Sequence, residues 1–182
     1  MKPVFITGNA DKAAYLAKHL GVALEHQRLE LDEIQSVSLE EIVTHKVKQA
    51  YQKIGKPVLV EDVALGFDGL SGLPGPFIKF FVDAPEGLTK LCQMCDGLAT
   101  RNAEASCVYG YYDGVSLQLF KGSLRGFISA SPKGDGGYGW DKIFCPEGYD
   151  GRTRAELTPE EDEATYTVIK PYEQLRNFLS NL

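Results

Sequence analysis

The chain has 182 residues, of which 43% are hydrophobic and 24% are charged, so it is long enough for one compact domain with a substantial core. Its 19 Lys and Arg against 25 Asp and Glu give a net charge of −6, which excludes the basic surface of a protein that binds long nucleic acids nonspecifically. No apolar run approaches the roughly 20 residues of a membrane-spanning helix, and the apolar amino-terminal stretch is too short for a signal peptide. Because four cysteines do not resemble a secreted disulfide framework, we expect a cytoplasmic protein with reduced thiols.

The amino-terminal pattern predicts a strand, a tight turn and a helix. A short apolar strand over residues 3–6 breaks at Thr7-Gly8-Asn9, and apolar residues at offsets of three and four then predict a helix that carries Lys12. Such a turn places backbone N–H groups, a helix N-terminus and an ammonium group together, which favours a phosphate site. The alternative is an ordinary strand-turn-helix junction. A second strand is expected at residues 27–31.

The next segment predicts an amphipathic helix followed by a buried strand. The helix is expected over residues 38–54, with Ser38 as its N-cap and Glu41 completing a capping box. The apolar run at residues 58–60 predicts a buried strand that ends at the acidic pair Glu61-Asp62.

The middle of the chain is richer in predicted strands. Apolar and polar residues alternate over residues 105–112, 117–121 and 123–129, and Asp113-Gly114 is a strong hairpin turn between the first two. A closing helix is expected over residues 169–179. Early alternation of strands and helices, with hairpins later, predicts a mixed sheet in an α/β fold.

Carboxylates follow two of the predicted strands. Glu33 comes after one strand and Glu61-Asp62 after another, and the carboxyl ends of strands in an open α/β sheet face the usual ligand crevice. Carboxylate oxygens there suit Mg²⁺, which takes a few such ligands together with water and substrate phosphates. The alternative is a solvated acidic loop.

Two segments rich in Gly, Pro and aromatic residues also favour a ligand site. Residues 72–79 and 136–141 allow close backbone approach to a flat ligand, with an aromatic face for stacking and with Asp141 to accept from N–H groups. The alternative is two rigid loops that pack aromatic side chains into the core.

Two other patterns are not favoured as sites. Cys92 and Cys95 have C-x-x-C spacing, but they lie in an apparent helix and have no second pair, so zinc is not favoured. The three histidines, His19, His26 and His45, show no spacing typical of a catalytic triad, and we interpret them as surface or satisfied residues.

Four segments, taken together and in this order, resemble the inosine triphosphate pyrophosphatase (Ham1-like) family over nearly the whole chain. They are Thr7-Gly8-Asn9-Ala10 with Lys12, Val60-Glu61-Asp62, Leu73-Pro74-Gly75-Pro76-Phe77-Ile78-Lys79, and Tyr138-Gly139-Trp140-Asp141. The resemblance implies a single domain over residues 1–182, with an elongated α/β fold, a long mixed sheet flanked by helices, and two lobes around a central nucleotide-binding cleft. It also implies a cytoplasmic, Mg²⁺-dependent homodimer that binds neither nucleic acid nor membrane. Such enzymes hydrolyse ITP, dITP and XTP to the monophosphate and pyrophosphate, a house-cleaning role in the nucleotide pool.

The resemblance further implies roles for individual residues. Glu33 and Asp62 would ligate Mg²⁺, and Asp62 would also act as the catalytic residue that orients or activates water. The phosphate contacts would be Thr7, Gly8, Asn9, Lys12, Lys46 and Lys79. The base contacts would be Tyr138, Gly139, Trp140 and Asp141, with Tyr138 stacking on the base and Asp141 bonding to its edge.

The chain departs from the family pattern on the base-reading side. The family usually has a Lys and then a Ser-His-Arg triplet, where this chain has Asp162 and Tyr166-Thr167-Val168; Val63 also stands where a hydroxyl residue is usual. Donors that read a keto oxygen are therefore lost, and four nearby basic residues are candidates to compensate: Lys142, Arg152, Arg154 and Lys170. Three hypotheses follow: retained preference for ITP and XTP, the same hydrolysis with altered or relaxed base specificity, and a nucleotide-binding protein with little catalysis.

Overall fold

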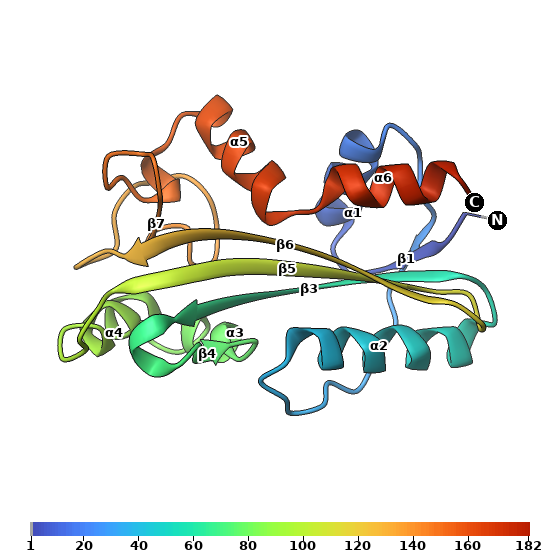
Figure 1. Ribbon diagram of the computed structural model, residues 1–182, viewed down its shortest axis with the longest axis horizontal. Coiled ribbons are helices and arrows are strands. Elements are labelled where there is room, and N and C mark those ends of the chain that lie inside the picture. The colour runs from blue at the N-terminus through green and yellow to red at the C-terminus, as the bar shows by residue number, and fades with distance from the viewer. Residues whose placement is uncertain (1) are drawn as a thin grey trace. The chain divides into compact units, whose positions relative to one another are not determined.

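A computed structural model describes residues 2–182 (Figure 1). Within these residues seven strands form one sheet in the order β2-β1-β3-β5-β6-β7, with β4 paired to β3 off this path. The strands are β1 (Val4–Ile6), β2 (His26–Gln27), β3 (Val58–Phe67), β4 (Pro74–Gly75), β5 (Asn102–Tyr112), β6 (Leu117–Ile128) and β7 (Phe144–Pro146). β1 runs parallel to β2 and β3, whereas β4 is antiparallel to β3 and β7 is antiparallel to β6. The predicted mixed sheet of an α/β fold is confirmed.

The helices fall into two compact units of the chain. The helices are α1 (Ala10–Leu20), α2 (Leu39–Ile54), α3 (Ile78–Val82), α4 (Gly87–Met94), α5 (Pro159–Ile169) and α6 (Tyr172–Ser180), with short 3₁₀ turns η1 (Asp68–Leu70) and η2 (Arg154–Glu156). The first unit consists of Met1–Asp62, Cys107–Lys121 and Lys170–Leu182, and the second of Val63–Ser106 and Gly122–Ile169. Among residues 2–182, no helix is both long and apolar enough to span a membrane.

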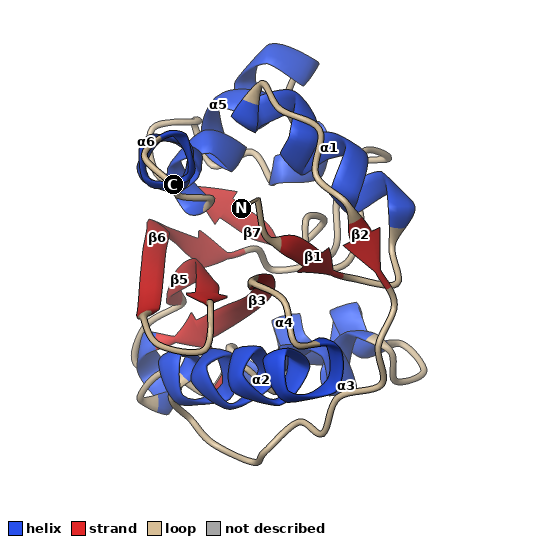
Figure 2. Ribbon diagram, turned by 90° about the vertical axis from the view of Figure 1, so that its right-hand side faces the viewer, coloured by secondary structure: helices blue, strands red, loops and turns tan. Residues whose placement is uncertain are grey.

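In the first unit, helices cover both faces of the strands. α1 and α6 lie on one face and α2 lies on the other, as Figures 1 and 2 show. α2 buries Val43, Val47 and Ala50 at helical spacing, and Val58 and Leu59 of β3 are also fully buried in the core.

Two local predictions in the first unit need correction. The strand expected at residues 27–31 is limited to His26–Gln27, because its pairing partner β1 ends at Ile6. The capping box of α2 is half formed: Ser38 Oγ accepts from the Glu41 backbone N–H (3.2 Å), but Glu41 bonds Ser36 Oγ (2.6 Å) rather than the backbone of Ser38.

The acidic pair Glu61-Asp62 lies inside β3 and not at its end, contrary to the prediction. β3 continues to Phe67 because β4 pairs with its second half, at Leu65 and Gly66. Consecutive side chains of a strand point to opposite faces of the sheet, so Glu61 faces α1 and α6 while Asp62 faces α2. The two adjacent residues of this motif therefore lie on opposite faces of the sheet.

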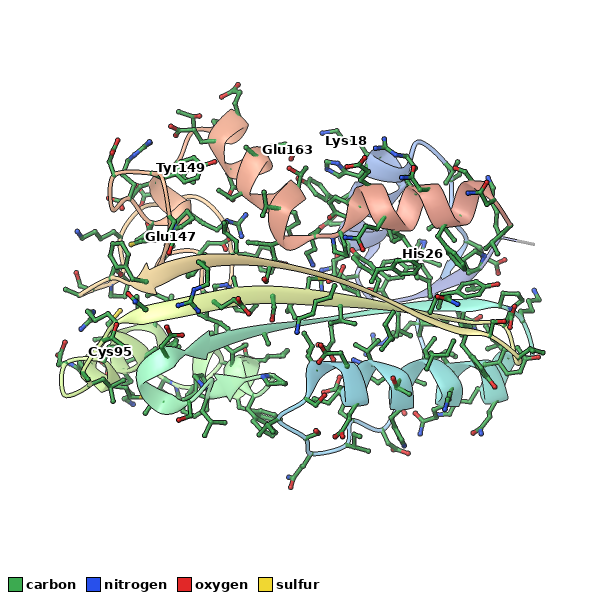
Figure 3. The ribbon with its side chains drawn as sticks, viewed as in Figure 1. Lys18, His26, Cys95, Glu147, Tyr149 and Glu163 are labelled. Atoms are coloured by element: carbon green, nitrogen blue, oxygen red, sulfur yellow. The ribbon has the colours of Figure 1, made fainter. Side chains whose placement is uncertain are left out.

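In the second unit, α3 and α4 lie on one side of the strands and α5 lies on the other (Figure 1). β6 is one strand where two were predicted, and Gly122 at its centre accommodates a close backbone approach: a Cβ there would lie 2.4 Å from the carbonyl oxygen of Ile169. Cys92 lies in α4, and Cys95, labelled in Figure 3, directly follows that helix. Both are buried free thiols.

The helix predicted over residues 169–179 is also corrected. Ile169 ends α5, and the closing helix α6 begins at Tyr172 after Pro171. Proline has no backbone N–H and fixes its own φ, so it separates the two helices and places Lys170 in the short connection between them.

Candidate functional site

The turn after β1 is closed by its own side chains. Asn9 Oδ1 accepts from the backbone N–H groups of Asp11 (2.9 Å) and Lys12 (3.1 Å), and Thr7 Oγ1 accepts from the N–H of Asn9 (3.1 Å). The amides predicted to be exposed for an anion are therefore capped by Asn9. The side chain of Arg28 lies against Gly8, where a Cβ would be 3.3 Å from its Cγ and Cδ, and so adds a cation that the sequence did not indicate.

Lys12 extends from the first turn of α1 to a carboxylate on β3. Its Nζ donates to Glu61 Oε1 at 3.2 Å, and the same oxygen accepts from Lys170 Nζ at 2.7 Å. The other oxygen of Glu61 accepts from the hydroxyl of Tyr109 on β5. Burial alone would raise the pKa of Glu61, but the ammonium groups of Lys170 and Lys12 and the Tyr109 hydroxyl lower it to about 2.

On the opposite face of β3, Lys46 of α2 joins the two predicted metal ligands. Lys46 Nζ donates to Glu33 Oε1 at 2.9 Å and to Asp62 Oδ2 at 3.0 Å. Burial alone would lower the pKa of Lys46, but the two carboxylates raise it above its ordinary value. Glu33 and Asp62 lie 13 and 16 positions from Lys46 along the chain, and the fold brings both of them to its ammonium group.

The donor set around Lys46 suits a magnesium ion. Among residues 2–182 no group of three or more His, Cys, Asp and Glu side chains could hold a metal, so Glu33 and Asp62 stand as a pair. Mg²⁺ is usually held by one or two carboxylates, with water and substrate phosphates as its other ligands. The Lys46 ammonium already shows that both carboxylates can contact a single cation.

The remaining predicted phosphate contact lies in the second unit. Lys79 belongs to α3, where its ammonium pairs with Asp83 one turn along the helix and is largely exposed. Pro74-Gly75, earlier in the same loop, forms β4 and pairs with Leu65 and Gly66 of β3. Two residues of this segment therefore belong to the sheet.

The predicted base-contacting segment forms a tight turn around Asp141. Tyr138 is exposed, and its backbone N–H donates to Asp141 Oδ2 at 3.0 Å. Gly137 has a φ of +65°, and a Cβ there would lie 2.5 Å from the same oxygen, so the turn requires glycine. Gly139 also has a positive φ, and the Nε1–H of half-buried Trp140 has no acceptor within residues 2–182.

Arg154 is the residue on which the departures from the family pattern converge. Its Nη1 donates to Asp141 Oδ1 (2.9 Å) and its Nη2 to Asp162 Oδ1 (2.6 Å), while its Nε donates to the Thr165 hydroxyl (2.9 Å). The guanidinium lies 4.8 Å from the centre of the Tyr166 ring, which is within the range of a cation–π contact. Its side chain is 4% exposed.

The other altered positions on α5 are Tyr166, Thr167 and Val168. The Tyr166 hydroxyl lies 3.4 Å from that of Tyr138, which brings two phenols together at the exposed end of the turn. Thr167 donates its hydroxyl to the backbone of Ala164, and Val168 is exposed. Among the candidate compensating residues, Arg154 contacts Asp141, whereas Arg152 pairs with Glu161.

Sequence reasoning did not assign Tyr109 to any site. It grouped Glu61 with Asp62 as a possible Mg²⁺ ligand, whereas the structure pairs Glu61 with Lys12 and Lys170. It named Arg154 only as a candidate to replace the lost base donors. The signal for Glu61 was present, because a carboxylate beside a buried apolar run requires cations nearby. No local pattern indicates that Arg154 contacts Asp141, because the two are 13 positions apart along the chain.

Comparison with known proteins gives a consistent result along the whole chain. The model of the Ham1 family matches residues 3–178. The chain is 42% identical to an inosine triphosphate pyrophosphatase from Emericella nidulans, over 96% of this chain and 94% of that protein. It is 44% identical to inosine triphosphate pyrophosphatase 2 from Trypanosoma cruzi, over 88% and 83%. A HAM1 protein from Coxiella burnetii has a solved structure that matches with a TM-score of 0.85 at 25% identity, covering all of both chains.

Proposed function

Because this chain belongs to the Ham1 family, we propose that it hydrolyses purine nucleoside triphosphates with deaminated bases, such as ITP, dITP and XTP, to the monophosphate and pyrophosphate. The relatives named as inosine triphosphate pyrophosphatases support this activity. The observation that carries the proposal is the convergence of Glu33 and Asp62 on Lys46, because a polyanionic substrate needs both cations and ligands for a divalent ion.

In this proposal, the chain's own residues receive the phosphates and position the water. Glu33 and Asp62 would hold Mg²⁺, which when bound supplies charge neutralisation for the phosphate oxygens. Lys12, Lys46 and Lys79 contact phosphate oxygens together with the turn at Thr7-Gly8-Asn9. The lysine side chains supply positive charge, and the turn supplies hydrogen-bond donors. The exceptions are Thr7 Oγ1 and Asn9 Oδ1, which accept hydrogen bonds within the turn.

The reaction requires little covalent chemistry from the protein. Water attacks the α-phosphorus, so a new P–O bond forms while the bond from the α-phosphorus to the bridging oxygen breaks. Pyrophosphate leaves with that oxygen. Asp62 orients the water or accepts its proton, and the lysine ammonium groups stabilise the charge on the phosphoryl oxygens and on the leaving group.

For the base, Tyr138 would stack on the ring, and Gly139, Trp140 and Asp141 would contact its edge. The specific observation that favours altered or relaxed base specificity as a second candidate is the grouping of Asp162 and Tyr166 around Arg154. The Arg154 donors are used inside the protein, whereas phenol hydroxyls both donate and accept, so they do not penalise a 6-amino group as a fixed cationic donor would.

We further propose that residues 1–182 act as a single catalytic domain, in a homodimer located in the cytoplasm.

The decisive experiment is pyrophosphate release, with Mg²⁺, across ITP, XTP, dITP, the four standard triphosphates and several modified ones. We expect turnover that depends on Mg²⁺ and is highest for ITP and XTP. Similar rates on ATP and ITP would support the relaxed-specificity candidate. Nucleotide binding without pyrophosphate release on any substrate would contradict the enzymatic proposal and favour a binding protein.

A further inference from the structure

Two lysines share one oxygen of Glu61, but the protein holds them differently. Lys170 Nζ is 2.7 Å from Glu61 Oε1 and its side chain is 5% exposed, whereas Lys12 Nζ is 3.2 Å away and its side chain is 33% exposed. The carboxylate between them is 6% exposed. One ammonium is therefore part of the interior, and the other reaches the solvent.

Lys170 is fixed by its surroundings. Its backbone oxygen accepts from the N–H of Tyr172 (2.8 Å), which anchors the connection into α6, and its ammonium lies 5.9 Å from the centre of the Tyr109 ring. Lys12 instead lies in the first turn of α1, directly beside the Asn9 cap. Lys12 can therefore turn toward an anion at this turn without any movement of Lys170.

The other polar groups of the cluster carry no charge that would alter this balance. Burial raises the pKa of the Cys107 thiol to about 12 and also raises the pKa values of Tyr109 and Tyr172. The cluster consequently contains one carboxylate and two ammonium groups. The cluster therefore holds one more ammonium group than is required to neutralise the Glu61 carboxylate.

We propose that Lys170 is a positioning residue for polyphosphate binding: it stays with Glu61 and so frees Lys12 to transfer to the phosphates of the substrate. The inference rests on the proposed role of Lys12 as a phosphate contact. A buried carboxylate stripped of its cations is strongly unfavourable. With Lys170 and the Tyr109 hydroxyl in place, Glu61 keeps partners when Lys12 departs, so Lys12 is available to the ligand.

The test compares a single and a double variant by titration calorimetry with inorganic tripolyphosphate in metal-free buffer, where binding is read without turnover. Lys170→Met leaves Lys12 as the only cation for Glu61, so affinity should fall by about tenfold or more. The double variant Glu61→Gln with Lys170→Met removes both charges of the inner pair and releases Lys12. Its affinity should return to within about threefold of the unmodified protein, and Lys170→Arg should behave like the unmodified protein.

Lys18→Met is the matched control, because it removes one positive charge from α1 at a residue away from Glu61. It should leave tripolyphosphate affinity within about twofold. Unchanged affinity in Lys170→Met, or a double variant that binds as weakly as the single one, would show that Lys170 only supports the fold. If Lys170→Met does not fold, weak binding by the charge-balanced double variant overturns the inference on its own.

The outcome separates this inference from the proposed function. If the unmodified protein releases no pyrophosphate from any triphosphate but the variants follow the expected pattern with tripolyphosphate, the enzymatic proposal fails and the role of Lys170 stands. If the unmodified protein hydrolyses ITP but affinity is the same in all variants, the role of Lys170 is excluded and the enzymatic proposal stands.

Discussion

Two arginines only two positions apart, Arg152 and Arg154, show how burial sets the energetic weight of an ion pair. Arg152 makes a bidentate pair with Glu161, with both distances at 2.7 Å, but its side chain is 36% exposed. Arg154 is almost fully buried between Asp141 and Asp162. Exposed pairs contribute about 0–1 kcal/mol, whereas loss of one partner of a buried pair costs about 3–5 kcal/mol.

We therefore expect Arg154→Met to lower the free energy of unfolding by about 3–5 kcal/mol, because it leaves the buried Asp141 carboxylate without its cation. Arg152→Met is the matched control and should lower the free energy of unfolding far less, because solvent screens its pair with Glu161. Urea unfolding followed by circular dichroism measures both. Equal losses for the two variants would contradict the assignment of Arg154 as the organising cation of the Tyr138–Asp141 turn.

Asp62 allows a direct test of the metal-ligand assignment. Asp62→Asn removes one charge with little change of shape, so Mg²⁺-dependent pyrophosphate release should fall by at least about 100-fold while the fold is retained. The control is Asp32→Asn, next to Glu33, because Asp32 accepts from Gln49 and faces no phosphate contact in the proposal. Near-normal turnover by Asp62→Asn would remove Asp62 from the metal site.

At the scale of the element, alternation along β3 and charge placement at the start of α5 have the clearest consequences. Successive side chains of β3 point to opposite faces of the sheet, so the adjacent residues Glu61 and Asp62 contact different lysines, Lys12 and Lys46. The first turn of α5 contains Glu160, Glu161 and Asp162, whose carboxylates interact favourably with the positive end of the helix dipole.

The start of α5 should respond to acid through Glu161. The hydrogen bonds from Arg152 and the Thr158 N–H lower the pKa of Glu161 to about 2, from an ordinary value of 4.5. A lowered pKa stabilises the folded state above pH 4.5, and this contribution is lost as the pH falls through about 2. Titration of the Glu161 carboxyl carbon by NMR should show this value. Arg152→Met should move it back toward the ordinary range, and Arg125→Met, which breaks a pair with Asp68, should leave it unchanged.

At the scale of the whole molecule, an acidic chain must receive an acidic substrate. The net charge of −6 and a triphosphate repel one another, so binding depends on the local lysines and on a divalent ion. Lys12 and Lys46 are paired with carboxylates before any ligand arrives. Tripolyphosphate that draws Lys46 away would leave Glu33 and Asp62 available to Mg²⁺, so the two ligands should favour each other.

This coupling predicts a stability change for the whole protein. Inorganic tripolyphosphate alone, at about 100 times its dissociation constant, should add about 2.7 kcal/mol to the free energy of unfolding. For a chain of this size that corresponds to a rise in Tm of roughly 5–10 °C. Differential scanning calorimetry should show that the shift with Mg²⁺ and tripolyphosphate together exceeds the sum of the separate shifts. Purely additive shifts would contradict the linkage between the lysine pairs and the metal ligands.

Much of the local structure follows from the sequence by itself. The 3.6-residue spacing of apolar side chains places α2 within one residue of its predicted bounds, and the turn signal Asp113-Gly114 lies between β5 and β6. The family assignment from four sequence segments is likewise confirmed, because the model of the Ham1 family matches residues 3–178. Periodicity and turn chemistry are properties of neighbouring residues, which is why the sequence determines them.

The extent of the strands and the partners of each charge were decided by tertiary structure. β3 runs past Asp62 because β4 returns to pair with it, and β2 is short because β1 ends early. Lys170 meets Glu61 across 109 positions of chain, and Arg154 gathers Asp141 and Asp162 from two different segments. A buried charge must find an opposite charge wherever the fold brings one within reach, so no local pattern in the sequence indicates which partner it takes.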